Sequence, residues 1–100
     1  MRAYVWTYRV KPEWTDAFRR AYSSTGDWAR LFLLSREYRG TDLLQLADDE
    51  CRYMTIDYFD TPDGRARFLA ENDDAYATLD RQWQDATIEE TFVGEFVIED

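Results

Sequence analysis

Alternating bulky side chains mark four candidate strands along the chain. Aromatic and β-branched residues are typical of strands, and the polar run 47–50 between the second and third predicts a hairpin. On the first strand Trp6 and Tyr8 share one face, while Val5 and Thr7 share the other. Because neither face is clearly polar, we expect the sheet to be covered on both sides. The predicted strands span residues 2–10, 38–46, 52–60 and 87–98.

Apolar residues recur every three or four positions in the remaining segments, which predicts amphipathic helices. Pro12 and Pro62 suit first helical turns, and Asp27 is a candidate N-cap for a short helix. The last helix carries the stripe formed by Leu69, Tyr76 and related apolar positions up to Trp83. The predicted helices span residues 12–22, 27–34 and 61–83.

This order of elements is the β-α-β-β-α-β pattern of an α+β, ferredoxin-like domain with one extra short helix. Residues 1–100 form a single domain. Such a domain has a four-stranded antiparallel sheet with helices on one face only. A second copy of the chain would cover the bare apolar face, so we expect a homodimer that packs sheet against sheet.

The charge balance excludes several classes of partner. Twelve basic against 21 acidic residues give a formal net charge of −9, and no basic stripe interrupts it. Such a field disfavours nucleic acids and anionic membranes. We read no signal peptide and no membrane span, and the lone Cys51 suits a reducing cytoplasm.

The chain contains no His. This excludes His general bases, Ser-His and Cys-His nucleophiles and His-ligated metals. The acidic run 48–50 lacks the spacing of a calcium loop, so a solvated hairpin tip is the simpler interpretation and no metal site is expected. Cys51 has acidic neighbours that disfavour a thiolate, and we interpret it as inert.

Four segments resemble the antibiotic biosynthesis monooxygenase family of the dimeric α/β-barrel type. They are VWTYRVKP, GDWARLF, YRGTDLL and RYMTIDYFDT, and the resemblance extends over nearly the whole chain. These segments are structural rather than catalytic. The resemblance implies a dimer of ferredoxin-like domains. The family includes cofactor-independent oxygenases that act on polycyclic phenols.

The haem-degrading branch of that family has an Asn on the first strand and a Trp and a His on the last long helix. By approximate register this sequence has Trp6, Phe68 and Thr78 at those positions. All three depart from the pattern, which argues against haem degradation. No cofactor is therefore expected.

Asn72 is a candidate catalytic amide. It lies four residues from both Phe68 and Tyr76, so on a continuous helix it shares their apolar stripe. A polar group there needs partners, and a substrate carbonyl or phenol is one such partner. A backbone hydrogen bond, or a kink at residues 71–74 that turns Asn72 to water, is the structural alternative.

Aromatic residues supply the candidate substrate-binding wall. Trp6 and Tyr8 are placed to stack on a flat ligand, with the Tyr8 hydroxyl as a catalytic candidate. Trp28 and Phe32 lie one turn apart on the short helix, where a lid over a pocket is expected, and Phe68 completes the set. Ordinary core packing is the alternative for all five.

Asp57 lies in the middle of a predicted strand. A buried, unpaired carboxylate has a raised pKa and can act as a general base. Arg9 on the neighbouring strand is the alternative partner, and the sequence favours this structural ion pair over a catalytic role.

The leading functional hypothesis is a cofactor-independent monooxygenase acting on a planar phenolic or polyketide-like compound, with Asp57 or a tyrosine moving the proton and Asn72 orienting the substrate. A non-catalytic module that binds a small aromatic ligand or only dimerises is a second hypothesis. A polyketide cyclase or aldolase-like enzyme is a third, because it needs acid–base groups but no oxygen.

Overall fold

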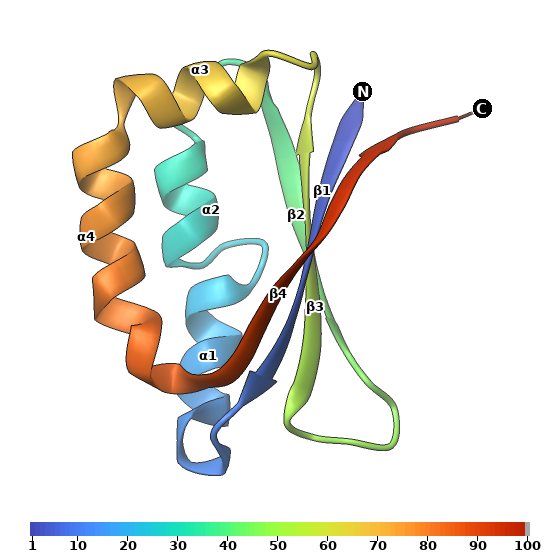
Figure 1. The fold of residues 1–100 in the computed structure, drawn as a ribbon, viewed down its shortest axis with the longest axis vertical. Coiled ribbons are helices and arrows are strands. Elements are labelled where there is room, and N and C mark those ends of the chain that lie inside the picture. The colour runs from blue at the N-terminus through green and yellow to red at the C-terminus, as the bar shows by residue number, and fades with distance from the viewer. Residues whose placement is uncertain (100) are drawn as a thin grey trace.

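Four strands form one antiparallel sheet in the order β2-β3-β1-β4, so β1 and β3 lie at its centre (Figure 1). The computed structural model describes residues 1–99. Each strand agrees with its predicted span to within one residue. The strands are β1 (Arg2–Val10), β2 (Tyr38–Gln45), β3 (Arg52–Phe59) and β4 (Thr87–Val97).

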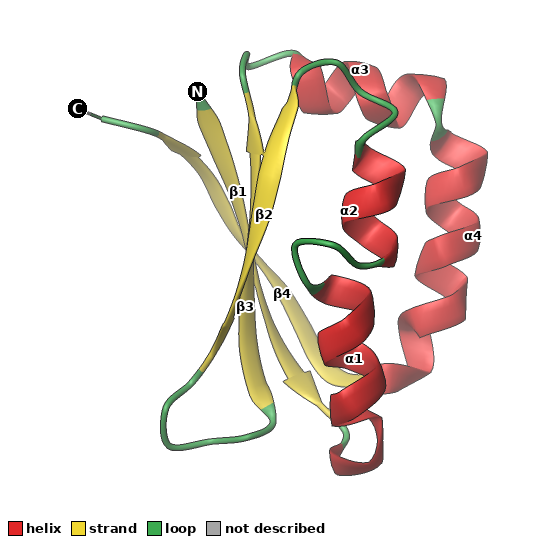
Figure 2. Cartoon of the chain, turned by 180° about the vertical axis from the view of Figure 1, so that it is seen from behind, coloured by secondary structure: helices red, strands yellow, loops and turns green. Residues whose placement is uncertain are grey.

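All the helices cover the same face of this sheet (Figure 2). This arrangement confirms the α+β, ferredoxin-like class with its extra short helix. None of the helices within residues 1–99 combines the length and the apolarity needed to cross a membrane. The helices are α1 (Thr15–Tyr22), α2 (Asp27–Phe32), α3 (Gly64–Glu71) and α4 (Asp73–Trp83), with 3₁₀ turns at Pro12–Trp14 and Gln84–Ala86.

The prediction of one continuous last helix is wrong, because the chain bends at Asn72. Its backbone leaves the helical region (φ −132°, ψ 30°) and separates α3 from α4. The Asn72 amide Nδ2 donates to the backbone oxygen of Phe68 at 3.0 Å. Asn favours such local side-chain to backbone bonds, which compete with a continuous helix. The structural alternative noted for this residue is therefore the one observed.

Strand register decides which side chains lie under the helices. Opposite residues pair Tyr4 with Asp57 and Trp6 with Thr55, and these lie on the helix-covered face. Arg9, an odd-numbered residue of β1, is exposed and belongs to the opposite face. The predicted ion pair between Arg9 and Asp57 is therefore wrong, because alternate side chains of a strand point to opposite faces.

Aromatic side chains fill the layer between the helices and the sheet. Phe18, Phe59 and Phe68 are buried almost completely. Phe18 stacks on Tyr22 with ring centroids 3.9 Å apart, and Phe59 packs edge-on against Tyr4 at 5.8 Å. Burying one such ring contributes about 1.5–3 kcal/mol.

A bulge in β2 brings two hydroxyls to the same face of the sheet. The register of β2 against β3 shifts by one residue between Tyr38 and Gly40. Gly40 adopts a φ of +128°. This conformation is strained for any residue with a Cβ, so glycine is required here. Because of the extra residue, Tyr38 and Thr41 both lie on the covered face, where their hydroxyl oxygens are 2.6 Å apart.

The opposite face of the sheet is covered by no element within residues 1–99. We call it the open face and define it by residues of all four strands. Phe96 and Leu44 are 48% and 45% exposed, Met54 and Ile56 are half-buried, and Val5 is buried. Its members are Val5, Thr7, Leu44, Met54, Ile56, Tyr58 and Phe96.

Candidate functional site

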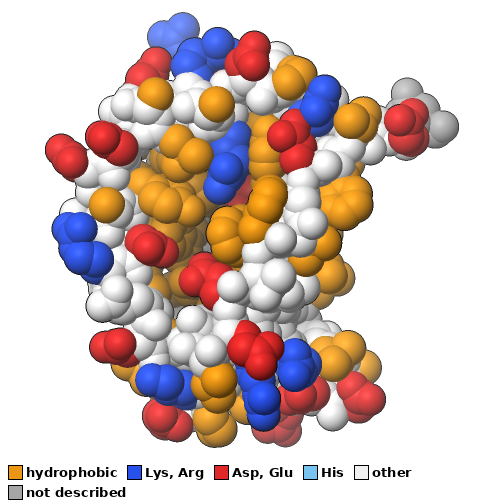
Figure 3. Space-filling view, viewed as in Figure 1, with side chains coloured by type: hydrophobic (Ala, Val, Ile, Leu, Met, Phe, Trp, Pro, Cys, Tyr) orange, Lys and Arg blue, Asp and Glu red, His pale blue; other side chains and the backbone are white. Residues whose placement is uncertain are grey.

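A pocket opens between the covered face of the sheet and the four helices. Figure 3 shows the hollow beside β4, with apolar walls and acidic side chains at its rim. Its cavity volume is about 30 Å³, and the hollow measures about 420 Å³ when the space open to solvent is included. The lining residues are Trp6, Tyr8, Tyr22, Trp28, Phe32, Thr41, Thr55, Asp57, Arg65, Tyr76, Asp80 and Glu90.

Six aromatic rings form the walls. Trp6 and Tyr8 come from β1, Tyr22 from α1, and Trp28 and Phe32 from α2. The sixth, Tyr76 of α4, meets the Trp28 ring edge-on at 5.0 Å and so joins the two helices across the pocket. Flat, rigid rings of this kind suit a planar ligand.

One wall carries an indole N–H that needs an acceptor. Trp28 is only 8% exposed, and its Nε1 has no hydrogen-bond partner within residues 1–99. A buried donor without a partner is costly by about 1–3 kcal/mol. Because Trp28 lines the pocket, an oxygen of a bound ligand would satisfy this donor.

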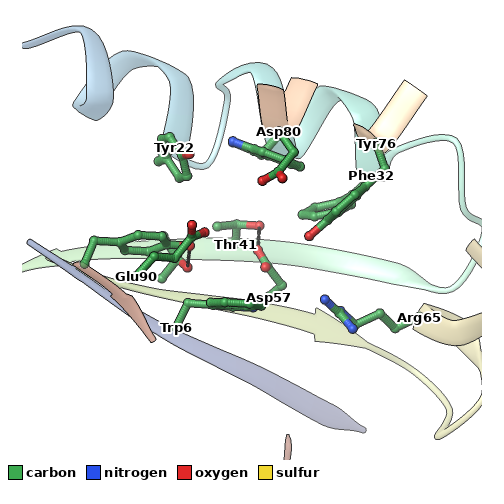
Figure 4. A pocket seen from close by; sticks show the side chains of 12 residues that line it. Trp6, Tyr22, Phe32, Thr41, Asp57, Arg65, Tyr76, Asp80 and Glu90 are labelled. Atoms are coloured by element: carbon green, nitrogen blue, oxygen red, sulfur yellow. Dashed lines mark hydrogen bonds between the residues drawn. The ribbon is translucent and has the colours of Figure 1, made fainter. Parts of the chain in front are cut away.

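Asp57 supplies a buried carboxylate to the floor of the pocket. The Thr41 hydroxyl donates to Asp57 Oδ1 at 2.6 Å, and the Tyr38 hydroxyl in turn lies 2.6 Å from Thr41 Oγ1 (Figure 4). Since Thr41 has one proton to give, Tyr38 is the donor to Thr41. The three residues form a chain of hydrogen bonds that ends on the carboxylate.

Burial raises the pKa of Asp57 from 3.8 to about 6, although the hydrogen bond from Thr41 and the charge of Arg65 both oppose the rise. A carboxyl with this pKa is mostly ionised at neutral pH and binds a proton more readily than an ordinary aspartate. It therefore has the properties of a general base.

Arg65 places a guanidinium beside this carboxylate. It lies in the first turn of α3, and its Cζ is 5.0 Å from the centre of the Tyr4 ring, a cation–π contact. The preceding residue, Gly64, packs so closely on the Glu37 side chain that an added Cβ would lie 3.0 Å from it. This close packing fixes the start of α3 beside the residue that precedes β2 and so positions Arg65 at the pocket.

Tyr8 is a hydrogen-bonding residue rather than a base. Its hydroxyl lies 3.1 Å from Thr55 Oγ1 on the neighbouring strand. Burial raises the pKa of Tyr8 well above its ordinary value, so the phenol stays protonated at neutral pH. It can donate to a ligand or to Thr55, but it does not accept a proton from a phenol.

Five of the predicted site residues meet at the pocket: Trp6, Tyr8, Trp28, Phe32 and Asp57. Phe68 does not line it. That ring is 2% exposed and packs edge-on against Phe32 at 5.3 Å, behind the wall. Asn72 also lies elsewhere, on an outer groove beside Glu37 and Arg67. The roles assigned to Phe68 and Asn72 therefore have no geometric support from the pocket.

Seven lining residues were not singled out from the sequence. Tyr22 and Tyr76 lie on the apolar stripes of their helices, and this pattern could have identified them as residues facing the sheet. Arg65 and Thr41 had none, because their positions depend on helix packing and on the bulge at Gly40. The others are Thr55, Asp80 and Glu90.

The arrangement offers aromatic walls, a proton acceptor and a cation that can stabilise an anion. Asp57 is the proton acceptor, and Arg65 is the cation nearest to it in the lining. In the described part of the chain, no three acidic or thiol side chains converge as ligands for a metal ion. The chemistry that these residues offer is acid–base chemistry.

No family model matches the sequence, and no curated protein matches it. Solved structures do match over almost the full length of the chain. One is a candidate antibiotic biosynthesis monooxygenase from Nitrosomonas europaea, with a TM-score of 0.73, 21% identity and coverage of 97% of each chain. A second protein from Bordetella bronchiseptica, with the same candidate assignment, has a TM-score of 0.75, 15% identity and coverage of 98% and 96%.

A third match is SnoaB, a cofactor-independent oxygenase from Streptomyces nogalater. Its TM-score is 0.71 at 18% identity, with 99% of this chain and 93% of that chain covered. Identities this low establish the fold and leave the chemistry to the residues of the pocket. The chain therefore has the fold of the antibiotic biosynthesis monooxygenases, as its sequence motifs predicted.

Proposed function

We propose that the protein is a cofactor-independent oxygenase acting on a planar phenolic or polyketide-like compound. The observation that carries the proposal is Asp57, a buried carboxylate with a pKa raised to about 6 in a pocket with aromatic walls. The fold shared with SnoaB, itself a cofactor-independent oxygenase, adds support.

In the proposed reaction the substrate lies flat among the aromatic side chains, and Asp57 accepts a proton from its hydroxyl or activated methylene. The electron-rich anion is stabilised by Arg65 and by the Trp28 N–H. It adds to molecular oxygen to form a hydroperoxide, which loses water and leaves a carbonyl. One oxygen atom enters the product and the other leaves as water, so the substrate supplies all the electrons.

We also propose that the working unit is a homodimer formed through the open face. Exposed apolar side chains such as Phe96 and Leu44 gather there beside Met54 and Ile56. Contiguous exposed apolar surface of this kind marks interaction sites in soluble proteins. A second copy offers the same surface, and two sheets pack face to face at about 10 Å.

Oxygen consumption with an anthrone as substrate tests the oxygenase. We expect one oxygen molecule consumed per quinone formed, with no added metal or cofactor. Asp57→Asn should lower the rate about 10²–10⁴-fold, the usual contribution of a positioned base. Asp48→Asn, which removes an exposed carboxylate at the hairpin tip, should leave the rate unchanged.

The other outcomes are informative. Turnover of a polyketide-like substrate without oxygen would contradict the proposal and favour a cyclase or aldolase. Binding without turnover under either atmosphere would favour a non-catalytic module.

A further inference from the structure

Two carboxylates lie on opposite sides of the pocket rim. Asp80 comes from α4 and Glu90 from β4, and Figure 4 shows both directed into the space between the helix and the sheet. Within residues 1–99 neither has a Lys or Arg at ion-pair distance, whereas six other acidic side chains do. The two carboxylates therefore have no direct ion-pair partner among the described residues.

The two charges act on each other. Partial desolvation and the negative charge of Asp80 raise the pKa of Glu90 above its ordinary value. A raised carboxyl pKa means that the surroundings of the carboxyl disfavour its anionic form. A cation bound between Asp80 and Glu90 would relieve this repulsion.

The walls beside this rim are also suited to a cation. Trp6 and Tyr22 line the same end of the pocket as Glu90 in Figure 4, and Tyr76 lies on the helix that carries Asp80. Aromatic faces attract ammonium groups, and rings combined with carboxylates are the usual way in which proteins recognise organic cations. A metal ion is a poorer fit, because no metal-ligating cluster of three forms in the described residues.

The opposite end of the pocket has a different character. Arg65 lies there, on the far side of Asp57 from Glu90 in Figure 4, and its guanidinium contacts the Tyr4 ring. The pocket thus offers a site for an oxyanion or phenol at one end and a site for a cation at the other. The buried N–H of Trp28, which has no partner among the described residues, adds a donor for an oxygen of the ligand.

We infer that the ligand is a planar phenol that carries a protonated amine, with the phenol at Asp57 and Arg65 and the ammonium group between Asp80 and Glu90. This inference rests on the proposed function only in taking the pocket as the substrate site. It specifies the substrate class: amine-bearing polycyclic phenols are preferred to neutral ones, and carboxylated ones are rejected.

Calorimetric titration of the full chain with three 2-naphthols tests the inference. The probes carry an aminomethyl, a hydroxymethyl or a carboxylate group at the same ring position. We expect the aminomethyl probe to bind about tenfold more tightly than the hydroxymethyl probe, because two carboxylates and the aromatic faces act together. The carboxylate probe should bind most weakly.

Asp80→Asn combined with Glu90→Gln should reduce the preference to about twofold or less. Glu89→Gln is the matched control, since the neighbouring Glu89 lies opposite Arg9 in the strand register, on the open face, and does not line the pocket. For the unmodified chain, raising the salt concentration from about 20 mM to about 500 mM should also weaken the preference. This second measurement needs no variant to fold.

Equal affinity for the three probes would overturn the inference, as would a preference that survives in the double variant or the absence of binding by all three. Oxygen uptake with an anthrone together with equal probe affinities would overturn the inference alone. If the unmodified chain consumes no oxygen with an anthrone but still prefers the aminomethyl probe, the proposed oxygenase is overturned and the inference stands.

Discussion

The two faces of one sheet carry different kinds of side chain in different surroundings. On the covered face, β3 presents Thr55, Asp57 and Phe59, which are buried beneath the helices. On the open face the alternate residues Met54 and Ile56 of the same strand remain half-buried. The polar, titratable groups lie where water is excluded, and the aliphatic groups lie where a second copy can cover them.

Under the proposed function, this difference allows one strand to support chemistry and assembly at the same time. A carboxylate gains an unusual pKa only where it is desolvated, which requires the helices. An apolar residue drives association only where its own chain leaves it uncovered. Variants on the two faces should therefore have separable effects.

The largest expected effect on folding comes from the covered face. Phe59 is fully buried and contacts the rings of Tyr4, Tyr38 and Phe68. Phe59→Ala should lower the free energy of unfolding by about 3–5 kcal/mol, because it leaves a cavity. Phe96→Ala on the open face should cost less than about 1 kcal/mol in the monomer. Urea denaturation measures both, and equal losses would contradict the distinction between the faces.

Removing the buried charge should stabilise the protein at neutral pH. The pKa of Asp57 is raised from 3.8 to about 6, so its carboxyl favours the folded state below pH 3.8 and loses that contribution as the pH rises through about 6. This loss corresponds to about 3 kcal/mol at most. Asp57→Asn should therefore unfold at higher urea concentration than the unmodified chain at pH 7.5, with the difference vanishing near pH 4. Asp48→Asn serves as the exposed control, and a destabilised Asp57→Asn at pH 7.5 would contradict the burial of a charged carboxylate.

Association should respond to the open face alone. Ile56→Asp places a charge at the centre of the open face, opposite Val5 of β1. We expect the dimer to dissociate at least about thirtyfold more readily, since a buried unpaired charge costs about 2 kcal/mol or more. Leu33→Asp changes a leucine that is 68% exposed next to α2 and should leave association unchanged. Sedimentation velocity distinguishes them, and a monomeric unmodified chain at micromolar concentration would rule out the dimer.

A smaller effect is expected from the hydrogen bond to Asp57. Thr41→Val removes the hydroxyl that donates to Asp57 Oδ1 and should raise the pKa of Asp57 further, because that hydrogen bond favours the carboxylate. The charged groups that face Asp57 from the pocket lining, Arg65, Asp80 and Glu90, are unchanged in this variant. Thr55→Val is the matched control, because Thr55 contacts Tyr8 instead. An NMR titration of the carboxyl carbon measures the pKa of Asp57. An equal pKa in the two variants would show that the hydrogen bond from Thr41 does not lower it.

Much of the fold followed from periodicity, because alternation and helical spacing are local properties of the chain. The strand spans, the element order and the aromatic face of β1 were all predicted in this way. Periodicity identifies which residues share a face, but strand register determines which residues become neighbours. The pairing of Asp57 with Tyr4 and Thr41, rather than with Arg9, depends on register.

The candidate site was therefore predicted only in part. Asp57 and the aromatic walls were recognisable as buried polar and bulky positions. Arg65 and Thr41 were not, because one depends on how α3 begins and the other on a single inserted residue beside Gly40. Asn72 was misplaced for the converse reason, since its local hydrogen bond bends a helix that the apolar stripe predicted to be continuous.

The most direct test of Asp57 as the base is the pH dependence of oxygen uptake with an anthrone. For the unmodified chain, kcat/KM should rise with pH through an apparent pKa of about 6 and then level off, as the carboxyl loses its proton. In Asp57→Asn this acid limb should disappear along with most of the rate. An Asp57→Asn variant that keeps both the rate and the acid limb of the unmodified chain would contradict the account.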